Sequence, residues 1–177
     1  DMGVPLNLHA NGDGAIDAFL RAHEKAAAGD LGKDRNVTMI HSQFVRKDQL
    51  DKYVQYKIRP SFYTLHTYYF AEAHIANRGP AQAMYISPMR DAIDKGLVPT
   101  NHTDFVVAPL DQMFMMWSAV NRLSRGGEVI GAECKRGQEL GDEAGHRHGD
   151  VTLPGGREHD PEVLVVEIDP KARIEAA

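Results

Sequence analysis

The chain has 177 residues, the length of one ordinary domain, and its 42% hydrophobic and 25% charged residues are typical of a globular protein. A formal charge of −5 argues against a nucleic-acid binder, which normally carries a basic face. The sequence contains no apolar run of about 18 residues, so it predicts no membrane span. The single cysteine excludes an internal disulfide, and we therefore expect a reducing, cytoplasmic location.

Short apolar runs alternate with helical patterns along most of the chain. In chain order we predict a strand at 4–8, a helix at 15–28, a strand at 36–40, a helix at 47–56, a strand at 56–62, a loop with one or two helical pieces at 71–96, a strand at 97–101 and a helix at 110–123. The strand segments are apolar without alternation, which indicates burial on both faces. This order predicts an α/β fold with a parallel sheet covered by helices.

Local signals set several of the expected boundaries. Asp13 is expected to be the N-cap of the first helix because its carboxylate can accept from free backbone N–H groups. Pro88 is expected to begin the last helical piece of the long loop, and Gly96 to end it. The last helix should bury one apolar side, which comprises Leu110, Met113, Phe114, Trp117 and Val120.

The character of the sequence changes after Arg125. Residues 126–162 are rich in Gly, charged residues and His and show little periodicity, which predicts irregular chain. Val163 to Ile168 is one further strand candidate. We therefore predict two parts, a domain of alternating strands and helices at 1–125 and an irregular tail with a possible small β-element at 126–177.

Histidines follow the first two predicted strands. His9 and His41 each end an apolar run and precede a turn into a helix. If the two strands are neighbours in a parallel sheet they lie about 4.8 Å apart, and two imidazoles can then share one metal at about 2.1 Å, which suits zinc. The alternative for each is a satisfied, half-buried histidine. Two histidines at equivalent positions in successive β/α units favour the metal site, because such folds place their chemistry at strand ends.

Polar residues also follow the later strands. Asp104 could bind the metal and accept a proton from metal-bound water, although taken alone it reads equally well as a loop residue that caps the next turn. His66 lies among aromatic residues and could contact substrate or stabilise an oxyanion; a packed aromatic loop is the equal alternative. His102 and Asn101 are interpreted as residues that only shape the strand end.

Taken together in order, several motifs resemble one enzyme family. The motifs are His9-Ala-Asn-Gly-Asp13, Met39-Ile-His41-Ser-Gln43, Ser61-Phe-Tyr-Thr-Leu-His66-Thr-Tyr68, Ile86-Ser-Pro-Met-Arg90, His102-Thr-Asp104 and Trp117-Ser-Ala-Val-Asn-Arg122. Residues 4–131 thereby resemble the YtcJ-like branch of the amidohydrolase superfamily, which includes N-substituted formamide deformylases. Each motif alone is weak, and the ordered set is specific.

The resemblance implies a fold and a mechanism. It implies strands 5 to 8, the C-terminal half, of a metal-dependent (β/α)8 TIM barrel. His9 and His41 would be the ligands on strands 5 and 6, and Asp104 the strand 8 ligand and catalytic proton shuttle, around one or two divalent ions, with zinc the expected metal. Metal-activated water would attack the carbonyl of an amide-type C–N bond, and His66 would contact the substrate.

The resemblance also implies what the chain lacks. Strands 1 to 4, with their His-x-His pair and strand 4 ligand, have no counterpart here, so we expect a fragment that is inactive or weak by itself. The expected partner is a small amide-type substrate, and we expect no nucleic acid, no membrane and no nucleotide cofactor. The sequence leaves open whether the protein forms a homo-oligomer. Two alternatives remain, a non-catalytic half-barrel that binds another chain and a hydrolase of esters or phosphoesters at the same site.

Overall fold

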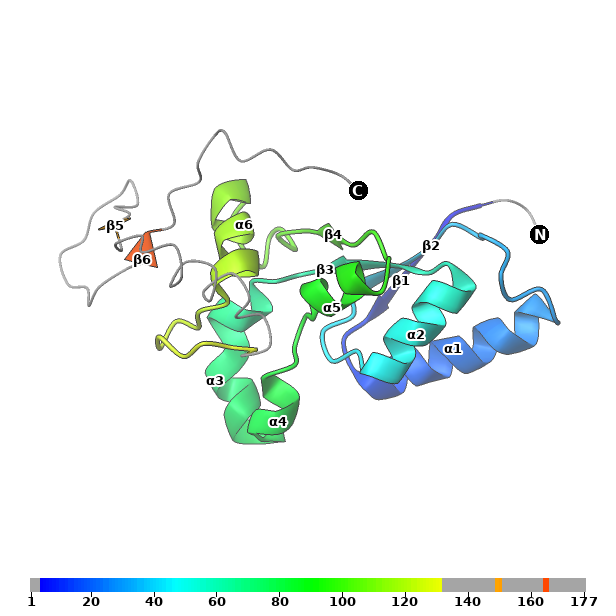
Figure 1. The fold of residues 1–177 in the computed structure, drawn as a ribbon, viewed down its shortest axis with the longest axis horizontal. Helices are drawn as coiled ribbons and strands as arrows, with labels where there is room; N and C mark the ends of the chain where they lie inside the picture. Colours follow the sequence, from blue (N-terminus) through cyan, green and yellow to red (C-terminus); the bar gives the residue numbers. More distant parts are fainter. Residues whose placement is uncertain (1–3, 132–148, 151–163, 166–177) are drawn as a thin grey trace. The chain divides into compact units, whose positions relative to one another are not determined.

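A computed structural model describes residues 4–131, 149–150 and 164–165 (Figure 1). It divides into two units, residues 1–135 and 136–177, and each is described by itself. The first unit contains a four-stranded parallel sheet in which the strands are neighbours in chain order: β1 (Leu6–Ala10), β2 (Val37–His41), β3 (Arg59–Phe62) and β4 (Thr100–Asn101). The predicted parallel α/β arrangement is confirmed, while closure into a barrel stays a prediction.

Helices follow each strand of this sheet. They are α1 (Asp13–Ala27), α2 (Lys47–Tyr56), α3 (His66–Arg78), α4 (Pro80–Ala83), α5 (Met89–Asp94) and α6 (Gln112–Asn121). The predicted bounds of α2 are confirmed, and α5 begins after Pro88 as expected. The predicted N-cap of α1 is wrong: Gly12 is the N-cap, and Asp13 is the first helical residue.

The sequence analysis missed the start of α3 and predicted too long a strand for β4. α3 begins at His66, inside the aromatic run that we interpreted as loop, and its N-cap Leu65 makes no side-chain cap hydrogen bond. Without a capping residue or a clean apolar stripe, the usual start signals of a helix are missing there. β4 keeps only two residues of the predicted strand 97–101, because only Thr100 and Asn101 pair with β3.

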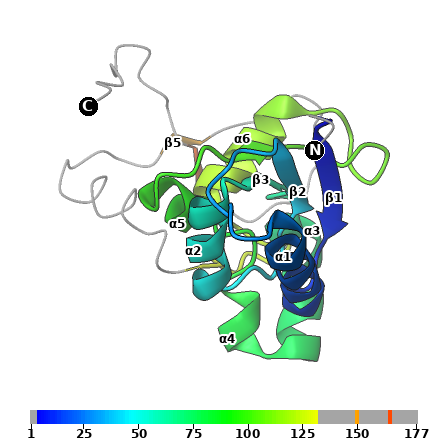
Figure 2. The same ribbon diagram turned by 90° about the vertical axis from the view of Figure 1, so that its right-hand side faces the viewer.

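The main core lies between the sheet and helices α1, α2 and α5, which Figures 1 and 2 show on one side of it. Its fully or nearly fully buried residues are Ala10, Ile16, Leu20, Val37, Met39, Val45, Leu50, Tyr53, Tyr56, Ile58, Phe62 and Ala92. Burying an aliphatic or aromatic side chain of this size contributes roughly 1.5 to 3 kcal/mol. Hydrophobic burial on this face therefore fixes which side of each strand faces the helices.

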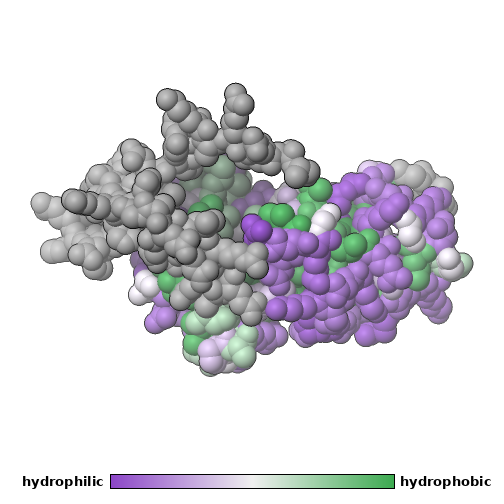
Figure 3. All heavy atoms as spheres, in the orientation of Figure 1, coloured by the Kyte–Doolittle hydropathy of each residue, from purple (hydrophilic) through white to green (hydrophobic). Residues whose placement is uncertain are grey.

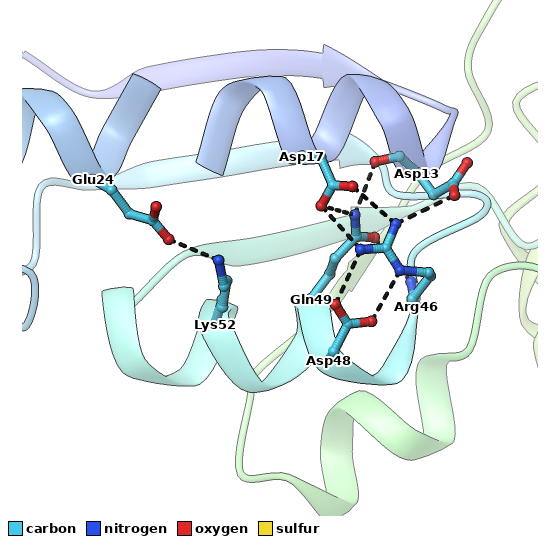
Figure 4. Close-up of polar contacts among 7 residues, drawn as sticks. All are labelled: Asp13, Asp17, Glu24, Arg46, Asp48, Gln49 and Lys52. Atoms are coloured by element: carbon cyan, nitrogen blue, oxygen red, sulfur yellow. Dashed lines mark hydrogen bonds and ion pairs between the residues drawn. The ribbon is translucent and has the colours of Figure 1, made fainter. Parts of the chain in front are cut away.

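A polar network joins α1 to α2 near the starts of the two helices (Figure 4). The Arg46 guanidinium makes two hydrogen bonds to the Asp17 carboxylate, at 3.0 and 3.1 Å, and one at 3.3 Å to Asp13. Gln49 adds a 2.7 Å bond to Asp17. These contacts lower the pKa of Asp17, chiefly through the hydrogen bonds of Arg46 and Gln49. Asp13 thus serves this network and does not cap the helix.

Helix α6 buries a different side from the predicted one. Leu110, Met113 and Val120 are 65%, 66% and 70% exposed, so this part of the predicted apolar side is wrong, whereas Phe114 is partly buried against a core cluster. Met115 and Ser118 are buried instead. Ser118 Oγ donates to the Thr64 carbonyl at 3.1 Å, which joins α6 to the loop after β3. By contrast, the visible surface over α1 and α2 is mainly hydrophilic (Figure 3).

The second unit contributes one described element. β5 (Gly149–Asp150) pairs antiparallel with β6 (Leu164–Val165), which lies inside the strand predicted at 163–168. The rest of the predicted tail beyond residue 131 lies outside the described residues, and the predicted boundary at 125 stays a prediction. Among the helices described, none is long and apolar enough to cross a membrane.

Candidate metal centre

The carboxyl ends of the four strands bring the predicted polar residues together. His9 lies opposite Ile40 in the neighbouring strand, and His41 is the last residue of β2. Asp104 follows the end of β4 by three residues. In parallel α/β folds this edge of the sheet carries the chemistry, because the loops after the strands converge there.

His41 and His9 meet although strand alternation would separate them. Val37, Met39 and His41 have the same parity, and the first two point into the core under the helices. His9 has the opposite parity to its buried neighbour Ala10. His41 nevertheless has a left-handed φ of 72°, and its ring centroid lies 4.6 Å from that of His9. The backbone twist at the strand end therefore turns His41 towards the site.

Three residues form the tightest donor cluster among the described residues. They are His41, His102 and Asp104, and one ligand atom from each lies within 4.8 Å of the other two. Nε2 of His41 lies 4.0 Å from Oδ2 of Asp104. Two ligands that each bind zinc at about 2.1 Å can be up to about 4.2 Å apart, so this pair can share one ion.

His102 is the residue that the sequence analysis undervalued. Its Nε2 lies 3.2 Å from Nδ1 of His41, and its Nδ1 lies 3.1 Å from Oγ of Ser61. The only sequence signal was its position two residues before Asp104. His9 is exposed and lies outside the tightest cluster, although its ring contacts His41.

The site favours neutral imidazoles. Burial lowers the pKa of His41 to about 4; Asp104 opposes the shift, and His102 and His9 add to it. Burial also lowers the pKa of His102, again with Asp104 opposing. A neutral imidazole has a free lone pair, which is the form that binds a metal. The two histidines are therefore in a metal-binding protonation state at neutral pH.

Unusual backbone conformations occur at two of the three predicted ligands. His41, Ser42 and Asp104 have φ values of 72°, 47° and 53°. Non-glycine residues in this region cost about 1 to 3 kcal/mol each and persist only where surrounding contacts hold them. Ser42 is held by a 3.0 Å backbone bond to Ala10 and by a 3.1 Å bond between its Oγ and the buried Tyr53 hydroxyl. Such conformations concentrate at functional sites.

His66 lies beside the cluster, at the start of α3. Its ring centroid is 5.6 Å from that of His41 and 4.5 Å from that of Tyr63. Burial lowers the pKa of His66 to about 3, so the ring is neutral. Nδ1 of His66 and the hydroxyl of Tyr63 are buried, and neither has a hydrogen-bond partner of acceptable geometry within the described part of the chain. Buried polar atoms without partners are rare and require an explanation.

A cavity away from this edge contains none of the predicted site residues. It measures about 470 Å³ and adjoins α1 and the start of β2. Its lining residues include Leu6, Phe19, His23 and Val37. The strand-end cluster, and not this cavity, unites the residues that the sequence predicted.

Comparison with known proteins decides the family. Residues 1–141 match the amidohydrolase family. The chain belongs to this family. A search of the curated proteins found no match.

Two solved structures are similar in fold to this chain. One is an uncharacterized metal-dependent hydrolase from Pyrococcus furiosus, with 25% identity and a TM-score of 0.58 over 75% of this chain and 25% of the other. The other, from Pyrococcus horikoshii OT3, has 24% identity and a TM-score of 0.60 over 77% of this chain and 26% of the other. The amidohydrolase chain thus spans about a quarter of the length of these structures.

Proposed function

We propose that this chain supplies part of the active site of a metal-dependent hydrolase of amide-type C–N bonds, in the YtcJ-like branch of its family. The observation that carries the proposal is the His41–Asp104 pair, 4.0 Å apart at the ends of parallel strands, with both residues in left-handed conformations. The similar Pyrococcus furiosus protein, described as a metal-dependent hydrolase, supports the same class.

The donor set fits a divalent metal. The His41 imidazole, which burial keeps neutral, and the Asp104 carboxylate are ligand types that zinc binds, and the His9 ring lies close enough to His41 to add a second imidazole. We propose His9, His41 and Asp104 as the protein ligands. Both edges of the described sheet, β1 and β4, are unpaired, which supports placing it within a (β/α)8 barrel whose other strands complete the ligand set.

Asp104 is the proposed proton carrier. A divalent ion bound here would lower the pKa of a water molecule and polarise the scissile carbonyl. The Asp104 carboxylate, 36% exposed, can take the proton from that water and pass it to the departing amine nitrogen. Its Oδ2 already lies 4.0 Å from Nε2 of His41, so the carboxylate faces the proposed metal position.

His66 and Tyr63 are the proposed substrate contacts. Nδ1 of His66 and the hydroxyl of Tyr63, which have no hydrogen-bond partner among the described residues, offer two buried hydrogen-bonding groups next to His41. Burial raises the pKa of Tyr63 to about 12, so its phenol stays protonated and can donate to a carbonyl oxygen. A substrate carbonyl would satisfy groups that otherwise carry a desolvation cost of about 1 to 3 kcal/mol each.

The test is hydrolysis by the full-length protein. The protein is stripped with a chelator, reloaded with Zn²⁺, Co²⁺ or Mn²⁺, and assayed on N-formyl and N-acyl amines, carboxylic esters and phosphotriesters. We expect metal-dependent release of amine from amides. Preferential cleavage of esters or phosphotriesters would replace the amide assignment, and metal binding without any hydrolysis would favour a non-catalytic binding role.

A matched pair of variants connects the activity to the site. Asp104→Asn removes the proton carrier, and we expect kcat to fall at least about 100-fold, the usual contribution of general acid–base catalysis. Asp30→Asn changes an exposed aspartate in the loop after α1 and should leave kcat unchanged. Equal kcat values for the two variants would contradict the role of Asp104.

A further inference from the structure

His102 stands between the proposed ligand His41 and strand β3. Its Nε2 is 3.2 Å from Nδ1 of His41, and its Nδ1 is 3.1 Å from Oγ of Ser61. Both contacts are within hydrogen-bond distance, and they use both nitrogens of the His102 ring. The three side chains therefore form a continuous chain from the middle of β3 to the end of β2.

This hydrogen-bonded series of side chains has only one consistent arrangement of protons if His41 binds a metal through Nε2. That nitrogen faces Asp104 and must keep its lone pair for the metal, so the single proton of neutral His41 is on Nδ1. Nδ1–H can then donate to Nε2 of His102, which must be unprotonated. His102 in turn carries its proton on Nδ1 and donates it to Oγ of Ser61.

The backbone around His102 keeps its ring in this position. The His102 N–H donates to the Phe62 carbonyl at 3.0 Å and to Oδ1 of Asn101 at 3.1 Å. Asn101 is itself fixed, because its Nδ2 donates to Oγ1 of Thr64 at 2.9 Å. His102 is thus bound to the adjoining strand end through both its backbone and its ring.

We propose that His102 is a positioning residue that fixes the tautomer and orientation of His41, and that it is not itself a metal ligand. This inference rests on the proposed metal site. Nε2 of His102 contacts the Nδ1 edge of His41, whereas the Asp104 carboxylate lies near Nε2, the other nitrogen of the ring. Partners of this kind typically change metal affinity 10- to 100-fold when they are removed.

The first test measures Co²⁺ affinity of the full-length protein by competition with a chelator, and counts imidazole ligands by X-ray absorption. We expect His102→Phe to weaken Co²⁺ binding about 10- to 100-fold with an unchanged imidazole count. His102→Gln should retain most of the affinity, because its side-chain oxygen can accept from Nδ1–H of His41. The control His23→Phe changes a buried histidine outside the cluster and should bind Co²⁺ like the wild type.

The outcomes separate this inference from the proposed function. A wild-type protein that binds no Co²⁺ would overturn the metal site itself. Wild-type binding with one imidazole fewer in His102→Phe would show that His102 is a ligand, and unchanged affinity in that variant would show that it does not position His41. Either result would overturn the positioning role alone.

A second test needs no variant. Nitrogen-15 NMR of the Zn²⁺-loaded wild-type protein distinguishes the two tautomers of a neutral imidazole. We expect the proton of His102 on Nδ1 and that of His41 on Nδ1. A proton on Nε2 of His102 would break the chain of hydrogen bonds and overturn the inference.

Discussion

Replacing Arg122 should destabilise the loops that support the strand-end site. Its guanidinium is nearly fully buried and donates to the backbone carbonyls of Ile130, at 2.7 Å, Ser87, at 3.0 Å, and Ile86. Ser87 in turn donates from its backbone N–H to Gln43 at 2.8 Å and from its Oγ to Tyr63 at 3.3 Å. Arg122 therefore holds the segment that contacts the loops after both β2 and β3.

The magnitude follows from the three carbonyls that Arg122→Met would leave without this donor. Each hydrogen bond to a charged group contributes about 1.5 to 3 kcal/mol, and removing the cation also removes the cost of burying it. We expect a loss of roughly 3 to 5 kcal/mol in the free energy of unfolding, which is a large share of the about 5 to 15 kcal/mol typical of a domain. Arg122→Lys should lose less, because one ammonium group can still bind some of these carbonyls.

Urea denaturation of the full-length protein, followed by far-UV circular dichroism, measures these differences. The control Arg21→Met removes an exposed arginine from α1 and should change the stability by less than about 0.5 kcal/mol. A value for Arg122→Met within about 1 kcal/mol of the wild type would refute the reasoning, because it would mean that the carbonyls find other partners without cost.

Three further predictions concern other parts of the chain. Burial lowers the pKa of His23, so at pH values below the ordinary pKa near 6.5 the unfolded state binds more protons than the folded state. The free energy of unfolding therefore decreases as the pH is lowered. His23→Phe should lose less stability than the wild type between pH 7 and pH 5 in urea titrations. Asp111 caps α6 by accepting from a backbone N–H at 2.8 Å, so Asp111→Ala should cost about 1 kcal/mol in the same assay, and an unchanged midpoint would contradict that role. Zn²⁺ at about 100 times its dissociation constant should raise the unfolding free energy by about 2.7 kcal/mol, with a smaller gain in Asp104→Asn; equal gains would exclude Asp104 as a ligand.

Local patterns were sufficient for the order and type of most elements. The apolar run before His41 and the polar helix after it are both present, and the bounds of α2 agree with the prediction. These features depend on residues close in sequence, whose spacing sets periodicity and whose turn residues set the ends. Where such signals were weak, as in the uncapped start of α3 inside an aromatic run, the element was missed.

The sequence also determined which residue types stand at the strand ends, and hence the family and the expected metal chemistry. His41 was favoured as a ligand from its position at a strand end, and Asp104 only together with the histidines and the family resemblance; the fold places the two side chains 4.0 Å apart. Their pairing follows from the parallel sheet, because strands in chain order bring their carboxyl ends to one edge.

Only the tertiary structure decided how those side chains face one another. Strand alternation places His41 on the helix side, and a left-handed φ of 72° turns it towards His9 and Asp104. The contact of His102 with His41 spans 61 positions in sequence. Likewise, the buried side of α6 carries Met115, which packs in a core cluster, and Ser118, which donates to the Thr64 carbonyl 54 positions away. Such features arise from contacts between distant segments, which local sequence patterns do not encode.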